Sequence, residues 1–322
     1  MRKKVSVVMP TYGKAGYIEK AIESVFDQTY PNIELVIVDD NGAGSENQLN
    51  TEKRIEKWKD KIRYIVQDTN RGSGAARNTG VEKASGEYVA FLDDDDFYLD
   101  SYIESMVNEL EKDSYDVVYE AEWFLLLDKT CFCAKKRPEK IEGDIHGRLL
   151  NGDVPITILF MFRKEIVQNI DLFHEGLMSY DEYDVWIRWT KKLRYACLTE
   201  PCAVVRRSSD NKSLTTNIDL RKEGLEYIKT TYFDPLKDNK TGRSVNIERI
   251  LECGLEKDRV YQLRNEKHKI PWKMIKDFAD RYEMSTKERL FFYINVLFND
   301  SYAVLYLKMF FFRFRYETLN IR

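Results

Sequence analysis

The chain has 322 residues, of which 43% are hydrophobic and 33% charged, and its formal net charge is −3. These values are typical of globular proteins and exclude the disordered and fibrous classes, while the length predicts about two domains. A near-neutral charge argues against a general nucleic-acid-binding protein, because such proteins use a basic excess to neutralise phosphates. The charge is uneven, since residues 1–220 carry −9 and residues 221–322 carry +6.

The cysteines and the apolar segments indicate the compartment. The five cysteines are odd in number and show no CxxC spacing, so neither a disulfide framework nor a zinc ribbon is expected. No apolar run near residue 5 resembles a signal peptide, and the apolar runs 290–298 and 303–312 are too short to span a membrane. We therefore expect a cytoplasmic protein.

The first 120 residues alternate short apolar runs with helical patterns. This alternation predicts an α/β fold with a mostly parallel, doubly wound sheet, in which ligands bind beyond the carboxyl ends of the strands. The expected strands are 5–9, 33–38, 62–67, 88–92 and an extended run at 116–127, and the expected helices lie near 18–26, 47–59, 73–83 and 103–110.

The remainder of the chain has a mixed and then a helical pattern. We expect strands at 157–163 and 202–207 and helices at 164–170 and 181–193. From about residue 221 onward the sequence is helical and rich in charge. We therefore predict a catalytic domain at 1–220 and a helical C-terminal region at 221–322.

An acidic run, Asp93 to Asp96, directly follows the expected strand 88–92. Adjacent carboxylates repel one another unless a cation compensates them, and a divalent metal bound to a diphosphate suits such a turn. The alternative is that Asp95 or Asp96 caps the next helix. Because capping does not need four carboxylates, the run favours a site for metal or diphosphate that includes Asp93, Asp94 and Asp95.

Polar residues end two other strands of the predicted sheet. Asp39 and Asp40 follow the second strand, and Pro10, Thr11 and Tyr12 follow the first. A carboxylate can accept hydrogen bonds from a base or a ribose, and Tyr12 can stack on a nucleobase. Asp40 with the Asn-Gly that follows is also a good turn sequence, so the acidic pair alone decides nothing. The three strand ends together indicate one nucleotide-binding crevice.

The segment from Asn70 to Asn78 contains Gly-Ser-Gly-Ala-Ala, which resembles the dinucleotide-binding pattern GxGxxG. Arg77 occupies the place of the third glycine, and the segment follows the third strand rather than the first, so a dehydrogenase is excluded. Arg71 and Arg77 instead suit a diphosphate, which planar guanidinium groups bind well. The alternative for either arginine is an ordinary place on a helix surface.

The segment from Ser179 to Trp186 places several carboxylates at the start of an amphipathic helix. Asp181 or Glu182 is a candidate general base, since a partly desolvated carboxylate can take a proton from an attacking hydroxyl. Ser179 and Glu182 also have capping-box spacing, which would engage Glu182 at its own helix end. The local pattern leaves both interpretations open.

These motifs together resemble the family 2 inverting glycosyltransferases of the GT-A fold. The resemblance covers about residues 4–210, and the order and spacing of the motifs make it specific. It rests on Val-Val-Met-Pro-Thr-Tyr (7–12), Val-Asp-Asp-Asn-Gly (38–42), Asn-Arg-Gly through Ala-Arg-Asn-Thr-Gly (70–80), Phe-Leu-Asp-Asp-Asp-Asp (91–96) and Asp-Glu-Tyr-Asp-Val-Trp (181–186).

The resemblance implies a nucleotide-diphosphate sugar donor, usually a UDP-sugar, with Mn²⁺ or Mg²⁺ as cofactor. It assigns Asp93 and Asp95 to the DxD pair, with Asp95 as the direct metal ligand, and the base to Glu182 or Asp181. It assigns Pro10, Thr11, Tyr12 and Asp39 to the nucleoside pocket, and Asn70 and Arg77 to that pocket or to the diphosphate.

Two positions depart from the family pattern. The family usually shows Glu-Asp where this chain has Asp181-Glu182, which leaves either residue as the base. Many members also carry a histidine soon after an arginine on a later strand, whereas this chain has Arg-Arg-Ser-Ser-Asp at 206–210. The metal would then have one or two protein ligands, or Asp210 would supply another.

We therefore expect transfer of a sugar to a hydroxyl of a glycan or a lipid-linked glycan, as in cell-surface polysaccharide synthesis. The alternatives are a nucleotidyltransferase that makes nucleotide-sugars and a non-catalytic module that binds a nucleotide-sugar or a partner. Aromatic and basic residues at 290–316 suggest peripheral contact with the inner face of the plasma membrane. Packing within a helical subdomain or a homodimer contact is the other explanation, and it is favoured because apolar helical faces commonly belong to a core.

Overall fold

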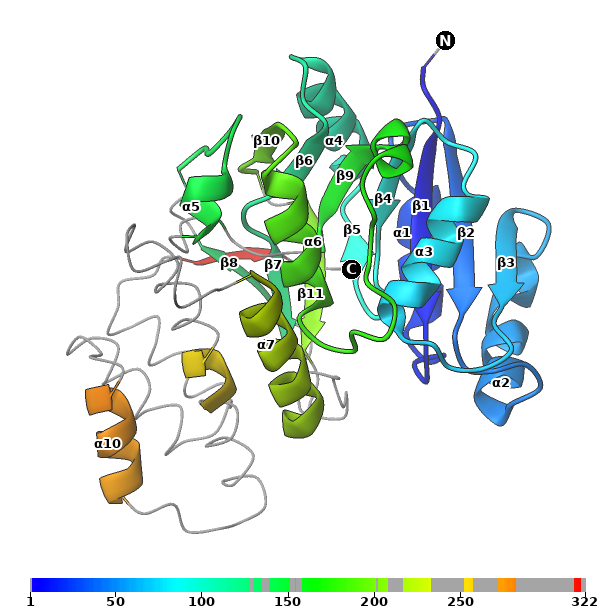
Figure 1. Cartoon of the computed structure of the whole chain (residues 1–322). Coiled ribbons are helices and arrows are strands. Elements are labelled where there is room, and N and C mark those ends of the chain that lie inside the picture. Colours follow the sequence, from blue (N-terminus) through cyan, green and yellow to red (C-terminus); the bar gives the residue numbers. More distant parts are fainter. Residues whose placement is uncertain are drawn as a thin grey trace.

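The computed structural model describes residues 2–127, 130–134, 139–150, 154, 158–200, 202–207, 217–232, 252–256, 272–281 and 316–319. Within these ranges, helices cover both faces of a central sheet, and the helices of the C-terminal region lie beside this unit (Figure 1).

The central sheet of the described residues has the strand order β10-β6-β9-β4-β1-β2-β3. Its neighbouring strands are parallel except at β9, which is antiparallel to both β4 and β6. The predicted α/β fold with a mostly parallel sheet is confirmed, although the sequence pattern does not predict the direction of β9. The strands are β1 (Val5–Thr11), β2 (Ile33–Asp39), β3 (Ile62–Val66), β4 (Tyr88–Phe91), β6 (Val117–Glu120), β9 (Phe160–Arg163) and β10 (Tyr195–Leu198).

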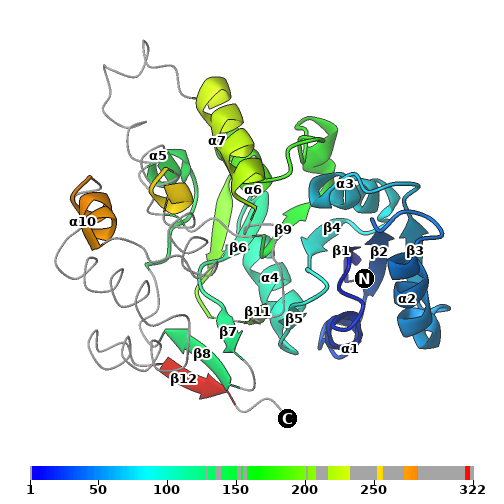
Figure 2. The ribbon, with the colours of Figure 1, turned by 90° about the horizontal axis from the view of Figure 1, so that it is seen from below.

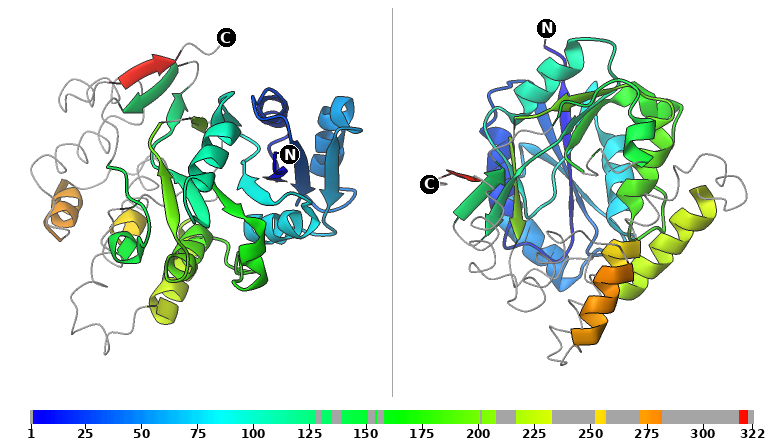
Figure 3. Two further views of the ribbon diagram at one scale, coloured as in Figure 1. Left: turned by 90° about the horizontal axis from the view of Figure 1, so that it is seen from above. Right: turned by 90° about the vertical axis from the view of Figure 1, so that its left-hand side faces the viewer.

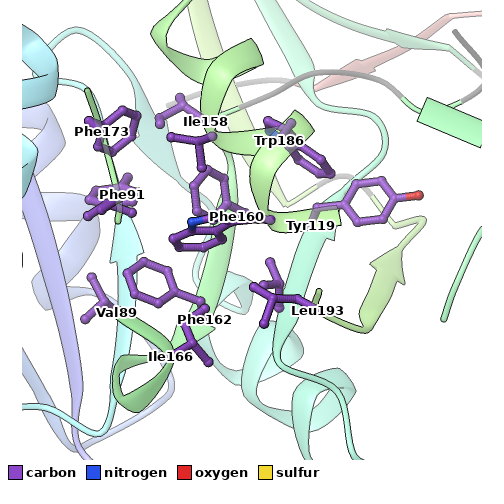
Figure 4. Packing of buried hydrophobic residues seen from close by; sticks show 14 of the residues in the cluster. Val89, Phe91, Tyr119, Ile158, Phe160, Phe162, Ile166, Phe173, Trp186 and Leu193 are labelled. Atoms are coloured by element: carbon purple, nitrogen blue, oxygen red, sulfur yellow. The ribbon is translucent and has the colours of Figure 1, made fainter. Parts of the chain in front are cut away.

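Two hydrophobic clusters lie on opposite faces of this sheet, because side chains alternate along each strand. Val8 packs on one face with Phe91 and Trp186, whereas Met9 packs on the other. Aromatic rings from β4, β9 and α6 interlock on the first face (Figure 4), with the rings of Phe91 and Phe160 5.4 Å apart. Helices α3 (Ser73–Lys83) and α6 (Asp181–Thr190) cover that face, and α1 (Ile18–Phe26) and α4 (Tyr102–Glu111) cover the other.

Several elements differ from the prediction. The extended run at 116–127 forms two strands, because the chain leaves the central sheet after β6 and enters a second sheet as β7 (Phe124–Leu127). The segment predicted as a helix at 164–170 is the 3₁₀ helix η2 (Lys164–Gln168). The expected helix at 47–59 divides into α2 (Glu46–Ile55) and the 3₁₀ helix η1 (Glu56–Trp58).

The second sheet of the described residues has the order β12-β8-β7-β11-β5 and lies at the edge of the molecule in Figure 2. It joins segments that are far apart in the sequence, since β5 follows the acidic run and β12 lies near the C-terminus. Its other strands, besides β7, are β5 (Phe97–Tyr98), β8 (Thr130–Ala134), β11 (Ala203–Arg207) and β12 (Tyr316–Leu319).

The C-terminal region contributes α7 (Ile218–Tyr232), a short helix at 252–256 and α10 (Trp272–Arg281) to the described structure. Figure 3 shows α7 beside α6, while α10 lies farther out. Among the helices described here, none is long and apolar enough to cross a membrane. Most of the predicted membrane or dimer segment, residues 290–315, lies outside the described residues, so that prediction and the domain boundary near 220 stay predictions.

Candidate active site

A cavity of about 380 Å³ opens at the carboxyl ends of β1, β2 and β4. The start of α3, the start of α6 and one residue of α7 complete its walls, so six segments of the chain meet there. Eleven of the residues predicted for the site line it: Pro10, Thr11, Tyr12, Asp40, Asn70, Arg77, Asp93, Asp94, Asp95, Asp181 and Glu182.

Asp39 and Arg71, which the sequence also places in the site, do not line this cavity. Asp39 is fully buried and accepts hydrogen bonds from the Tyr64 hydroxyl at 2.6 Å and from the Asn41 backbone N–H at 2.9 Å. The Arg71 guanidinium faces outward and pairs with Glu175 at 2.5 Å. Asp39 therefore lies behind the surface of the cavity, and its predicted place in the nucleoside pocket stays a prediction.

Asp40 orders the loop that carries Asn70. Its two carboxylate oxygens accept the backbone N–H groups of Arg71 and Gly72, each at 2.8 Å. Burial raises the pKa of Asp40, although these two hydrogen bonds oppose the rise. Gly72 has a φ of 89°, a conformation that glycine adopts without steric cost, and α3 begins directly after it.

Each carboxylate of the acidic run has its own donor. The Thr11 hydroxyl donates to Asp94 at 2.7 Å, and the backbone N–H of Arg206 donates to Asp96 at 2.8 Å. Burial, reinforced by neighbouring carboxylates, raises the pKa of Asp94 to about 7 and raises that of Asp96 well above its ordinary value. The predicted alternative of a helix cap is wrong, because β5 follows the run and α4 begins only at Tyr102, with Ser101 before it.

Lys14 is a cavity residue that the sequence motifs do not reveal. Its Nζ lies 2.6 Å from a carboxylate oxygen of Asp95. Burial opposes the charge of this lysine, but Asp95 and the adjacent aspartates outweigh it and raise the pKa of Lys14. A basic residue three positions after Thr11 is the signal in the sequence, and it is weak because lysines are common in loops.

Three of these carboxylates suit a divalent cation. Asp93, Asp95 and Asp96 each offer an oxygen, and these oxygens lie within 4.8 Å of one another. Oxygen ligands of this kind are those that Mg²⁺ and Mn²⁺ prefer. The ion pair between Lys14 and Asp95 shows that this turn already attracts one cationic group. The donor set thus fits the predicted metal, while Asp210 lies outside the described residues.

The opposite wall of the cavity is the first turn of α6. Tyr180 precedes the helix in the left-handed conformation, with φ 62° and ψ 16°, and its side chain makes no capping hydrogen bond. The helix thus begins at a backbone turn, and the predicted capping box of Ser179 and Glu182 does not form its start. Asp181 and Glu182 face the cavity, whereas Asp184 is fully buried away from it and pairs with Arg188 at 2.5 Å.

Arg77 connects the two acidic walls. Its guanidinium is 2.7 Å from an oxygen of Asp93 and 3.6 Å from one of Asp181, and it lies over the ring of Phe173. Burial opposes its charge, but Asp93, Asp181 and Glu182 raise the pKa of Arg77. Burial raises the pKa of Asp181 even though Arg77 opposes the rise. One buried cation thus contacts carboxylates of both acidic walls.

The comparisons with known proteins agree with this geometry. The model of "Glycosyl transferase family 2" matches residues 6–121. An uncharacterized glycosyltransferase of Rickettsia prowazekii is 31% identical over 223 residues, which cover 68% of this chain and 67% of that protein. One from Rickettsia felis is 32% identical over 199 residues, and the match spans only 31% of that longer protein.

Two solved structures show the same fold. The first is TarS 1-349 of S. aureus, solved with UDP-GlcNAc. Its TM-score with this chain is 0.56 at 16% sequence identity, and the match covers 91% of this chain and 79% of TarS 1-349. The second is the mannosyltransferase PcManGT of Pyrobaculum calidifontis, solved with GDP-Man and Mn²⁺, with a TM-score of 0.55, 16% identity, and coverage of 94% and 89%. The family model, the relatives in sequence and the fold agree. The chain belongs to the family 2 glycosyltransferases and has their GT-A fold.

Proposed function

We propose that this glycosyltransferase is a metal-dependent, inverting enzyme that moves a sugar from a nucleotide-diphosphate donor, a UDP-sugar in the first instance, to a hydroxyl of a glycan or lipid-linked glycan. The observation that carries the proposal is the position of Arg77 between Asp93 and Asp181. It brings a cluster suited to a metal diphosphate and a candidate base to one cavity, which is what a one-step transfer requires.

The nucleoside part of the donor fits the side of the cavity formed by Pro10, Thr11 and Tyr12. The Tyr12 side chain is 50% exposed, and its ring is available to stack on a base. Asn70 and the loop held by Asp40 border the same side. Polar backbone and amide groups next to an aromatic ring are the usual means of fixing a base and a ribose.

The diphosphate fits beside Arg77 and the acidic turn, which line the same cavity. Asp95 and Asp93 would hold the cation, and a bound Mn²⁺ or Mg²⁺ would offset the negative charge that develops on the leaving diphosphate. Lys14 and Arg77 add fixed positive charge to the same place. A guanidinium beside the diphosphate can donate two parallel hydrogen bonds to it, which also sets its orientation.

Glu182 is the residue we assign as general base. Asp181 lies 3.6 Å from the buried guanidinium of Arg77, so its carboxylate is engaged in the contact between the two acidic walls. Glu182 has the longer side chain and lines the cavity. Its carboxylate takes the proton of the acceptor hydroxyl, the oxygen bonds to the anomeric carbon, and the bond to the diphosphate breaks with its electron pair. A single in-line displacement inverts the anomeric configuration.

A donor screen followed by a transfer assay tests the proposal. Thermal shifts with UDP-, GDP-, dTDP- and CMP-sugars, each with and without Mn²⁺, identify the donor, since a ligand that binds the native state raises the melting temperature. Transfer to a panel of glycan and polyprenyl-linked acceptors should then release the nucleoside diphosphate and give an inverted product. Release of pyrophosphate would identify a nucleotidyltransferase instead, and activity unchanged in EDTA would contradict the metal.

The predicted membrane contact extends this proposal to a lipid-linked acceptor. Liposome binding of the full chain should exceed that of a variant that lacks residues 290–322 if the acceptor is met at a membrane surface. Equal binding would remove the membrane part and leave the transferase part intact.

A further inference from the structure

Helix α7 lies beyond the segment that the family model matches, yet it contacts the turn that precedes the proposed base. We propose that α7 is a positioning element of the active site, in which Gly224 and Arg221 hold the left-handed turn at Tyr180 and thereby orient Asp181 and Glu182. This inference rests on the proposed function and extends it to the C-terminal region.

The turn at Tyr180 needs external support. Among the described residues, Tyr180 is the one position other than glycine with a positive φ, at 62°. For a residue with a Cβ atom, this conformation is less stable than the right-handed region, because the Cβ atom comes too close to the following carbonyl oxygen. Such strain persists only where surrounding contacts hold it, and it occurs often beside functional groups. The two residues that follow Tyr180 are Asp181 and Glu182, which line the cavity.

Gly224 lets the backbone of α7 touch this turn. A Cβ atom added at Gly224 would lie 2.3 Å from the carbonyl oxygen of Ser179 and 3.0 Å from its carbonyl carbon. Real Cβ atoms do not approach other atoms so closely, and the atoms in the way are backbone atoms of the turn itself. Any larger residue at position 224 must therefore push α7 and the turn apart.

Arg221 holds the same turn through its side chain. It lies three residues before Gly224 and thus on the same face of α7. Its Nη2 donates to the Tyr180 hydroxyl at 3.0 Å, and its guanidinium carbon lies 5.1 Å from the centre of the Tyr180 ring. Arg221 also lines the cavity, so its contact with Tyr180 lies next to the space where an acceptor would bind.

A second contact between the two helices limits rotation of α6. The hydroxyls of Tyr227 and Tyr232 donate to Asp184, the buried carboxylate one turn into α6. Arg188 donates to the same carboxylate through its Nε at 3.0 Å. Because α7 holds α6 at the preceding turn and again at Asp184, the side chains of Asp181 and Glu182 have a defined direction.

A double-mutant cycle tests the role of Arg221. The variants Arg221→Met, Tyr180→Phe and their combination are compared with the wild type by kcat, by KM for the donor and by Mn²⁺ binding. We expect each single change to lower kcat, by roughly 10- to 100-fold for Arg221→Met, because a small misplacement of a reacting group has this effect. The double variant should be no slower than Arg221→Met, and Arg221→Lys should recover part of the rate.

The same variants separate positioning from general loss of structure. Donor KM and Mn²⁺ binding should stay at wild-type values, and the pH profile of kcat should shift because the surroundings of the base change. Additive effects in the cycle, or a rise in KM for the acceptor with kcat unchanged, would show that Arg221 acts on the substrate and would overturn the inference.

Gly224→Ala gives an independent test with a matched control. We expect kcat to fall at least tenfold at 25 °C, consistent with displacement of the turn. Gly147→Ala in α5 (His146–Leu150) is the control, since a Cβ there meets nothing within 4 Å. Full activity of Gly224→Ala would contradict the inference. A wild type that transfers no sugar would instead contradict the proposed function.

Discussion

The two acidic walls of the cavity keep their carboxylates in place by different means. On the strand side, Asp93 to Asp96 sit in a turn directly after β4, and hydroxyl, backbone and cationic donors reach them from other segments. On the helix side, Asp181 and Glu182 follow a strained backbone turn that a neighbouring helix supports. The first arrangement is electrostatic, and the second is steric.

The difference suits the two tasks that we propose. A site for a cation and a diphosphate needs concentrated negative charge, which is stable only while positive charge stands close to it. A base must instead point at one proton, and its direction matters more than the total charge nearby. Arg77 belongs to both walls, because it contacts Asp93 on one and Asp181 on the other.

The largest effect is expected on the strand side of the cavity, where Asp93 to Asp96 lie. Asp95→Ala should lower transfer by roughly 10³-fold, since the charge stabilisation that a bound cation supplies is several kcal/mol and each 1.36 kcal/mol is a factor of ten. Mn²⁺ binding, followed by electron paramagnetic resonance, should weaken in parallel. Asp60→Ala, at an exposed position, is the control. Wild-type metal binding by Asp95→Ala would remove Asp95 from the site.

The next largest effect is expected on the helix side of the cavity, where Asp181 and Glu182 lie. Glu182→Gln should lower kcat by roughly 10²- to 10⁴-fold, the usual contribution of a general base, and leave Mn²⁺ binding unchanged. Asp181→Asn should lower both kcat and the stability of the fold, because it removes a partner of Arg77. Glu165→Gln, at an exposed position on η2, should behave like the wild type. If Glu182→Gln and Asp181→Asn both transfer sugar at wild-type rates, neither residue is the base.

Arg77→Met tests the residue that the walls share. Loss of the guanidinium leaves two carboxylates without their buried partner, and the free energy of unfolding should fall by about 3 kcal/mol, the lower end of the range for a broken buried pair, because Asp93 is partly exposed. Urea denaturation measures this change. The matched variant Arg63→Met, at an exposed arginine, should change stability by no more than about 0.5 kcal/mol. Equal stability of the two variants would show that Arg77 does not join the walls.

A carboxylate outside both walls should make the stability of the fold depend on pH. Glu120 ends β6 and accepts the backbone N–H groups of Cys202 and Ala203, and burial raises its pKa to about 8 although these hydrogen bonds oppose the rise. The folded state therefore binds a proton more tightly than the unfolded state, and stability should decrease as the pH rises from about 4.5 to 8.

Glu120→Gln should remove this dependence, because the amide keeps the acceptor oxygen without the ionisable group. The melting temperature of the variant, measured from pH 5 to 9, should fall less with pH than that of the wild type. Parallel curves would contradict the raised pKa of Glu120.

The sequence predicted the strand-side wall better than the helix-side wall. The positions of Thr11, Asp40 and Asp93 follow from three apolar runs and the rule that ligands meet the carboxyl ends of parallel strands. The sequence does not predict that Asp40 lines the cavity while Asp39 lies behind its surface, because this depends on the orientation of β2 at its last residue, Asp39.

Most features that the sequence does not predict depend on contacts between residues far apart in the chain. Arg221 meets Tyr180 across 41 residues, and no local pattern marks either one. Helix α3 is predicted from end to end because its boundaries depend on local glycine and alanine chemistry. The direction of β9 is not predicted, because a short apolar run has the same sequence pattern whether the strand is parallel or antiparallel. Lys14 is missed for a similar reason, since its importance depends on the fold that brings Asp95 to it.

The short strand β5 gives the acidic turn a mechanical role. Asp93 to Asp96 leave β4 of the central sheet, and the chain then enters β5, which pairs with β11 of the second sheet through Phe97 and Tyr98. The turn is therefore a rigid joint between two sheets, and the backbone of Arg206 in β11 also reaches Asp96. A displacement of the second sheet would be transmitted to the carboxylates at the joint, so substitutions in β11 can alter ligand affinity in the cavity without touching the ligand.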